Sequence, residues 1–200
     1  MQLPPILEAV SSMSAIEKLV DEHRLISRMV NVLTVLHKRL ESGDNADVKV
    51  LTDVVDFLRI FVDRNHHAKE EDALFPTLER RAVNPQGCTI QSLKNEHEQG
   101  RILATSLTDA IGKYKTGDPT AKNKISAAMR SSIDLYNDHI WRENILLFPT
   151  AEKALNESEL NDVTRSYGEI DKRFGRDFRS KYQQLVKALE ESTGVGHEAA

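Results

Sequence analysis

The sequence predicts an all-α protein: an antiparallel up-and-down four-helix bundle with an additional C-terminal helix. Three observations predict this class. The 200 residues include only 9 glycines and 6 prolines, too few for the closely spaced turns of a β-sandwich. Apolar residues recur at steps of three and four along stretches of roughly 30 residues, the period of amphipathic helices. Short turn-forming segments separate these stretches, and short connections between long helices favour antiparallel neighbours.

Four segments rich in turn-forming residues set the expected ends of the helices. They are 42–45 (Ser-Gly-Asp-Asn), 82–87 (Ala-Val-Asn-Pro-Gln-Gly), 116–119 (Thr-Gly-Asp-Pro) and the softer 156–161. We therefore expect a bundle over residues 14–155, preceded by an N-terminal extension over 1–13.

Each bundle helix is expected to bury one stripe, and all four stripes contain histidine. The first stripe is Leu19, His23, Ile26, Val30, Leu33, His37 and Leu40. The second is Leu51, Val55, Leu58, Val62, His66, Glu70 and Leu74. The third is Ile90, Leu93, His97, Gly100, Ala104, Leu107, Ile111 and Tyr114. The fourth is Ile125, Met129, Ser132, Tyr136, His139, Glu143 and Leu146. Histidine and glutamate are poor core residues unless something pairs with them, so these positions are candidates for function.

A fifth helix is expected at roughly 159–191 and should pack across or beside the bundle. Its stripe is Ile170, Phe174, Phe178, Tyr182 and Leu185. We accordingly assign residues 156–191 to this C-terminal helix and residues 192–200 to a flexible tail.

The two halves of the chain repeat one another. Residues 66–76 (HHAKEEDALFP) match residues 139–149 (HIWRENILLFP), 73 positions later, and Glu22-His23 matches Glu96-His97, 74 positions later. A spacing of four places the histidine and glutamate of each repeat on one helix face. Antiparallel packing then brings four histidines and two glutamates into one mid-bundle layer: His23, His66, Glu70, His97, His139 and Glu143.

Four imidazoles and two carboxylates from four helices suit two transition-metal ions. Imidazole binds iron, zinc, copper or nickel, and carboxylate adds a preference for iron or manganese. Two shared carboxylates leave positions open for an oxo or hydroxo bridge and for dioxygen, peroxide or nitric oxide. A ferritin-like di-iron site needs Glu-x-x-His on two helices, and the sequence contains no such motif. Zinc and manganese remain alternatives to iron.

These motifs resemble the hemerythrin-like, HHE cation-binding domain family, in its four-His, two-Glu subgroup, over about residues 14–155. The resemblance rests on Glu22-His23, on 66–76, on Glu96 to Arg101 and on 139–149. It implies a four-helix bundle that holds two iron ions in an oxo- or hydroxo-bridged di-iron centre. The ligands that it implies are His23, His66, Glu70, His97, His139 and Glu143.

Two departures from the oxygen-carrying hemerythrins bear on function. Their fifth histidine falls at the position of Arg101, and the aspartate of their fourth helix falls at Asn144. A simple reversible oxygen carrier is therefore disfavoured. Fewer ligands, with Gly100 beside the site as a point of access, favour peroxide breakdown, nitric oxide handling, or redox and oxygen sensing.

Five further residues are candidates to support the ligands from outside. Glu22 and Glu96 adjoin ligands and could accept an imidazole N–H. His67 and Glu71 have the same four-residue spacing as His66 and Glu70 but are shifted by one residue along the helix. They either lie at the interface between helices or support the site. Tyr136 lies one turn before His139 and either packs the core or hydrogen-bonds a bound ligand.

Composition excludes several classes of protein. With 27 basic and 31 acidic residues the net charge is -4, which disfavours nucleic-acid and membrane-surface binding. No signal peptide or membrane-spanning run is apparent in the sequence. The single cysteine, Cys88, excludes an internal disulfide and is consistent with a reducing compartment, so a cytoplasmic location is expected.

The leading hypothesis is a non-heme di-iron protein of the oxidative or nitrosative stress response. It would bind or react with dioxygen, nitric oxide or peroxide at an open iron position. The alternative is an iron- or oxygen-sensing module without turnover, read by a protein partner that the sequence does not name. Iron storage or delivery is weaker, because a two-metal site stores little. The sequence leaves open whether the protein is an enzyme.

Overall fold

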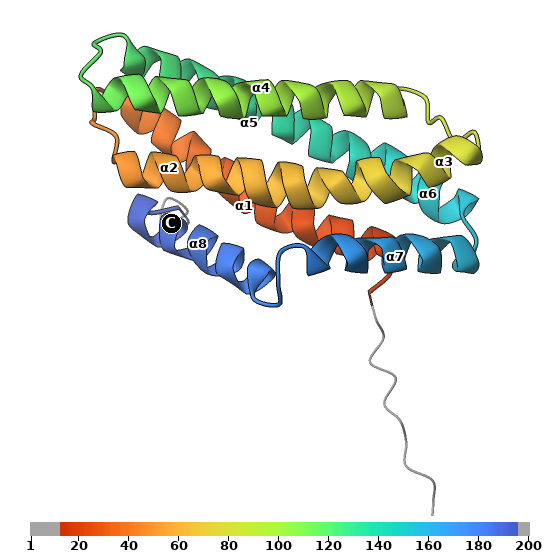
Figure 1. The fold of residues 1–200 in the computed structure, drawn as a ribbon. Coiled ribbons are helices and arrows are strands. Elements are labelled where there is room, and N and C mark those ends of the chain that lie inside the picture. The colour runs from red at the N-terminus through yellow and green to blue at the C-terminus, as the bar shows by residue number, and fades with distance from the viewer. Residues whose placement is uncertain (1–12, 196–200) are drawn as a thin grey trace, which may run out of the picture.

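The computed structural model describes residues 13–195, and every regular element within that range is helical (Figure 1). Four long helical rods form the bundle, which confirms the predicted fold class. The first and third rods are α1 (Ala15–Glu41) and α4 (Ile90–Lys115). The second runs through α2 (Val48–Asp56), η1 (Phe57–His67), η2 (Glu70–Leu74) and α3 (Phe75–Arg80). The fourth runs through α5 (Ala121–Arg142), η3 (Glu143–Leu147) and α6 (Phe148–Ala154).

Local sequence explains where the helices begin. Ser14 and Glu17 form a reciprocal capping box at the start of α1, and the side chains of Asp47 and Thr89 cap α2 and α4. Such caps satisfy N–H groups that have no partner within the helix. Gly117 follows α4 with a φ of 83°, a left-handed conformation that glycine adopts without steric cost.

Three segments of the second and fourth rods are π-helical: η1, η2 and η3. They fall on the two repeated His-x-x-x-Glu motifs. Pro76 and Pro149 follow directly, each as the second residue of the next α-helix. A proline has no N–H to donate, and the wider π turn just before it lets the rod continue without a break. π-helical turns within α-helices are frequently found at functional sites.

The C-terminal region differs from the single helix expected at 159–191. It forms two helices, α7 (Glu157–Lys172) and α8 (Phe178–Thr193). Gly175 has a φ of 85°, which a continuous α-helix cannot contain, so the chain turns there despite its unbroken apolar stripe. The helical end at Thr193 also places the start of the predicted tail two residues too early. Residues 1–12 of the predicted N-terminal extension and 196–200 of the tail lie outside the described residues.

Two separate hydrophobic clusters fill the bundle. One contains Met29, Leu33 and Phe61, toward the end where α1 meets α2. The other contains Leu19, Phe75 and Phe148, toward the opposite end. On each rod, the sequence-predicted histidines lie between residues of the two clusters. The candidate site is therefore a polar layer with apolar packing on both sides.

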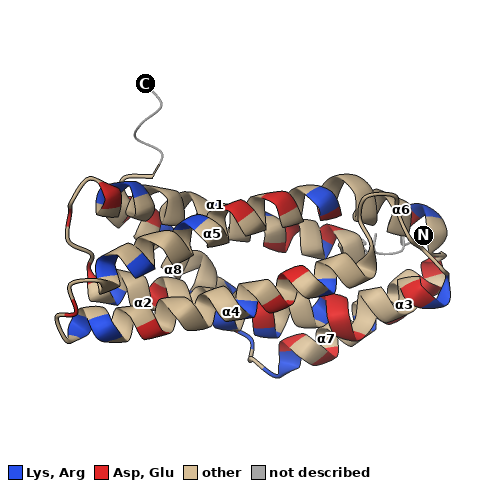
Figure 2. Cartoon of the chain, turned by 90° about the horizontal axis from the view of Figure 1, so that it is seen from above, with Lys and Arg blue, Asp and Glu red and all other residues tan. Residues whose placement is uncertain are grey.

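Both C-terminal helices lie against α1, and the aromatic ring of Phe178 on α8 stacks on Phe61 with ring centroids 6.0 Å apart. Seen from above, acidic and basic residues are interspersed along the helices (Figure 2). Among the described residues, no helix has the length and apolar character needed to cross a membrane.

Candidate metal centre

The structure brings the six predicted ligands into one buried layer. α1 contributes His23, η1 and η2 contribute His66 and Glu70, α4 contributes His97, α5 contributes His139 and η3 contributes Glu143. None of the six is more than 2% exposed. Across the layer, the ring centroids of His23 and His66 lie 4.7 Å apart, and those of His97 and His139 lie 4.9 Å apart.

Each of the four histidine rings is held from outside through its Nδ1 atom. The partners are Asn144 for His23 at 2.9 Å, Glu22 for His66 at 3.0 Å, Glu71 for His97 at 2.6 Å and Glu96 for His139 at 2.9 Å. Three partners are carboxylates and the fourth is an amide oxygen, so Nδ1–H donates in every case. The lone pair of each Nε2 is then directed into the layer, as required of a metal ligand.

The inward-facing atoms are mutually unfavourable without a cation. Nε2 lone pairs face carboxylate oxygens at short range. The distances are 3.2 Å from Glu143 Oε2 to Nε2 of both His23 and His139, 3.6 Å from Glu70 Oε1 to His66 Nε2, and 3.4 Å from Glu70 Oε2 to His97 Nε2. Nε2 of His23, Nε2 of His66 and all four carboxylate oxygens have no hydrogen-bond partner. Buried acceptors left unpaired in this way are costly.

The same atoms form two overlapping groups that fit two metal ions. The first group is His23, His66, Glu70 and Glu143, and the second is His97, His139, Glu70 and Glu143. Within each group the ligand atoms all lie within 4.8 Å of one another. Both carboxylates belong to both groups, so the donor set fits a pair of ions that share two glutamates.

The ionisation of the layer follows from burial. Burial lowers the pKa of His66 to about 4, so this imidazole is neutral and free to coordinate at physiological pH. Burial raises the pKa of Glu70 well above its usual value, and the nearby charge of Glu143 raises it further. Burial also raises the pKa of Glu143, but His139 and His23 outweigh it and lower that pKa to about 2. The two carboxylates therefore ionise unequally, and a bound cation would favour the ionised form of both.

The predicted supporting residues Glu22, Glu96 and Glu71 are all in place on ring nitrogens. Asn144 has the same role on His23, which sequence reasoning missed. The repeat contains the signal, because Asn144 lies 73 positions after Glu71. The two residues are equivalents in the two halves.

A further shell of cations lies outside the acids, and the sequence did not indicate it. Lys69 Nζ pairs with Glu22, Arg142 Nη1 lies 2.7 Å from Glu96, and Arg101 Nη2 lies 3.1 Å from Glu71. Arg101 stands where the oxygen carriers have their fifth histidine. It supports the ring of His97 through Glu71 and contributes no ligand to either group.

His67 lies at the layer as well as at the seam between helices. It is 2% exposed, and its ring stacks on that of His97 with centroids 3.7 Å apart. It forms a third group of candidate ligands with His97 and His139, and its Nδ1 has no hydrogen-bond partner. Its equivalent in the second half is Ile140.

Tyr136 and Gly100 pack against each other beside this histidine. A Cβ on Gly100 would lie 3.0 Å from Tyr136 Oη. Both residues line a cavity of about 180 Å³, together with His67 and Arg101. Burial raises the pKa of Tyr136 well above its usual value, so the phenol stays protonated. Gly100 and Tyr136 thus line the same cavity as His67.

Comparison with known proteins agrees with this geometry. The sequence profile of the Hemerythrin HHE cation binding domain matches residues 14–151. Uncharacterized proteins of Mycobacterium tuberculosis and Mycobacterium bovis are similar to the chain, with 24% identity over 183 residues. The alignment covers 91% of this chain and 71% of each relative. No solved structure matches the chain.

Proposed function

The chain belongs to the hemerythrin HHE cation-binding family, and we propose that it is a non-heme di-iron protein that binds or reacts with dioxygen, nitric oxide or peroxide. We place this activity in the response to oxidative or nitrosative stress. The proposal takes His23, His66, Glu70, His97, His139 and Glu143 as the iron ligands.

The observation that carries the proposal is the set of unpaired acceptors in the buried layer. Two Nε2 atoms and four carboxylate oxygens lack partners, although the Nδ1 side of every ring is satisfied. A purely structural polar core would pair such atoms with donors. Two divalent or trivalent cations would compensate all of them at once.

Iron held by this donor set supplies redox chemistry and open coordination positions for a small ligand. The chain itself supplies the geometry. The three carboxylates on Nδ1 fix ring orientation and raise the basicity of the imidazoles. The hydrophobic clusters on both sides keep bulk water out of the layer.

We place the approach of the small ligand on the side of His67. His67 lines the cavity of about 180 Å³ together with Gly100 and Tyr136. His67 forms a candidate ligand group with His97 and His139 and stacks on His97 with ring centroids 3.7 Å apart, whereas its ring centroid lies 5.7 Å from that of His66 in the first group. Its imidazole can donate a hydrogen bond to a ligand that arrives there, which favours the second metal position as the reactive one.

The test is metal content together with an optical spectrum, on protein purified in air, before and after peroxide is added. We expect about two irons per chain and a near-ultraviolet charge-transfer band that responds to peroxide. Glu143→Ala should remove both. His37→Ala is the matched control, because His37 lies on α1 but bonds Ser126 instead of the layer. A folded protein with zinc alone, or without metal, would overturn the proposal.

A second candidate is a sensor in which metal occupancy stabilises the bundle without turnover. The position of the layer between two hydrophobic clusters favours it, because occupancy then couples directly to folding. Oxygen release from added peroxide distinguishes the two. Rapid release supports the enzyme, whereas a large metal-dependent rise in melting temperature without release supports the sensor.

A further inference from the structure

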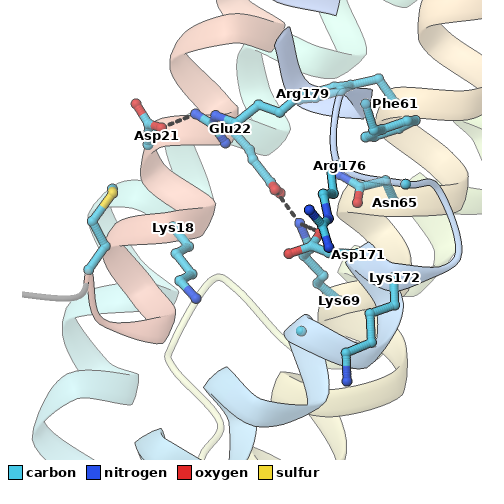
Figure 3. A pocket seen from close by; sticks show the side chains of 14 residues that line it. Lys18, Asp21, Glu22, Phe61, Asn65, Lys69, Asp171, Lys172, Arg176 and Arg179 are labelled. Carbon is cyan, nitrogen blue, oxygen red and sulfur yellow. Dashed lines mark hydrogen bonds and ion pairs between the residues drawn. The ribbon is translucent and has the colours of Figure 1, made fainter. Parts of the chain in front are cut away.

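A cavity outside the metal layer lies between α1, η1 and the segment that joins α7 to α8 (Figure 3). Its volume is about 630 Å³, within the range of small-molecule sites. Glu22 and Lys69 form part of its wall. The cavity is therefore separated from the ligand His66 by Glu22.

Each of the three acids that line this cavity has a basic partner. Asp21 pairs with Arg179, and Glu22 pairs with Lys69. Asp171 Oδ1 lies 2.7 Å from Lys69 Nζ. Figure 3 shows these pairs joined across the cavity wall. Lys69 is shared by two of these three acids, but five basic residues line the cavity, so the net charge of its wall favours an anion.

Two cations on the wall have no acidic partner within the part of the chain that the structure describes. They are Lys18 on α1 and Arg176 in the linker between α7 and α8. Asn65 also lines the cavity, is 1% exposed, and has an Oδ1 without a hydrogen-bond partner. An acid group would find two cations at the wall, and a neighbouring N–H or O–H donor of the same molecule would satisfy the amide oxygen.

Apart from Lys172, which pairs with Glu169 on the same helix, the remaining wall is apolar. Phe61, which is 1% exposed, and Phe178 line the cavity, and Gly168 leaves space where a side chain would stand. Rings of this kind bury a flat or aliphatic body favourably. The cavity therefore combines an anion-binding end with an apolar body.

The equivalent position in the second half of the chain lacks these features. The cavity beside Glu96 and Arg142 measures about 580 Å³ and is lined also by Asp134 and Asp138. No aromatic residue lines it. The combination of cations and rings is thus specific to the side that α7 and α8 cover.

We infer that the cavity between α1, η1 and the α7–α8 linker binds a small organic acid with an aromatic or aliphatic body. Lys18 and Arg176 hold the acid group, and Phe61 and Phe178 hold the body. This site is distinct from the metal layer and does not depend on which metal occupies it.

The test is calorimetric titration of the full chain, as purified, with 2-naphthoate and with 2-naphthamide, which has the same ring system without the charge. We expect the acid to bind at one site per chain, about tenfold more tightly than the amide. Lys18→Gln combined with Arg176→Gln should remove this preference. The pair Lys153→Gln and Arg130→Gln, which lies outside the cavity, should keep it.

A cavity-filling variant tests the location independently of charge. Gly168→Phe should abolish binding, because the new ring would occupy the space of the ligand. Gly112→Phe is the matched control, since Gly112 is also a helical glycine with nothing within 4 Å of an added Cβ, and it should bind normally. Absence of 2-naphthoate binding, equal binding of acid and amide, or unchanged binding by Gly168→Phe would each overturn the inference.

Discussion

The two halves of the molecule build the same chain of contacts around their histidines, but in different surroundings. The chains are Lys69–Glu22–His66 in the first half and Arg142–Glu96–His139 in the second. The side chain of Lys69 is 4% exposed, because Asp171 of α7 also covers it, whereas that of Arg142 is 27% exposed. The repeat thus preserves the contacts, while the elements packed outside decide how much each contact contributes to stability.

The halves also differ at one position inside the layer. The first half has His67 where the second has Ile140, and His67 lies on the rings of the second half. The second candidate ligand group is therefore the one with an additional imidazole stacked beside it, so the two groups have unequal surroundings although their residue types are matched.

The largest expected effect is a loss of bound metal. It should be greater for a carboxylate that belongs to both candidate groups than for a histidine that belongs to one. Glu70 belongs to both candidate groups, whereas His66 belongs only to the first. We expect Glu70→Ala to lose both metal ions and His66→Ala to retain about one, measured as metal per folded chain. Equal retention by the two variants would show that the carboxylate is not shared.

The next largest effect is a loss of stability, which should differ between variants of Lys69 and Arg142. Lys69→Met leaves the buried Glu22 without its cation and should lower the free energy of unfolding by about 3 kcal/mol. Arg142→Met removes a partly exposed pair and should cost less than about 1 kcal/mol. Urea denaturation of both variants gives the comparison, and similar losses would contradict the role assigned to α7.

The contribution of the buried Lys69–Glu22–His66 contacts to stability should depend on pH. Burial raises the pKa of Glu22, but His66 and Lys69 outweigh it and lower that pKa to about 2, against a usual value of 4.5. A carboxyl group whose pKa is lowered in the folded state stabilises that state fully above pH 4.5. This contribution is lost as the pH falls toward 2. The stability difference between metal-free wild type and Glu22→Gln should therefore shrink over that window, as followed by urea denaturation at each pH. A pH-independent difference would contradict this account.

The smallest expected effect comes from the substitution that makes the two halves alike at this position. His67→Ile removes a buried imidazole whose Nδ1 is unpaired, and should raise the stability of the metal-free protein by about 1 kcal/mol. Ile140→Val, at the equivalent position, should lower it by about as much. Thermal unfolding checks both values, and a marked destabilisation by His67→Ile would show that its ring packing outweighs the unpaired nitrogen.

The fold class followed from periodicity, and the candidate ligands from the repeat. His23 and His97 stood out because aliphatic stripes tolerate histidine poorly. The supporting Glu22 and Glu96 were identified because they repeat as well. Local patterns of this kind are readable because helix periodicity places their members on one face.

Features that depend on packing between distant segments were not predictable. In the sequence, nothing distinguishes Lys69 from an ordinary surface lysine. In the structure, Asp171, about a hundred positions later, covers it. The turn at Gly175 was missed because the apolar stripe of the C-terminal region continues through it. The π-helical turns before Pro76 and Pro149 have no periodic signature, since one added residue leaves the flanking stripes intact.

The loop between α3 and α4, residues 81–89, has a consequence for protein engineering. Each candidate ligand group takes both histidines from one half of the chain but a carboxylate from each half. Neither helical hairpin can complete a site alone. A chain cut in this loop would therefore give two fragments that would need a bound metal ion to reassemble. Such a pair of fragments would be a metal-dependent split protein.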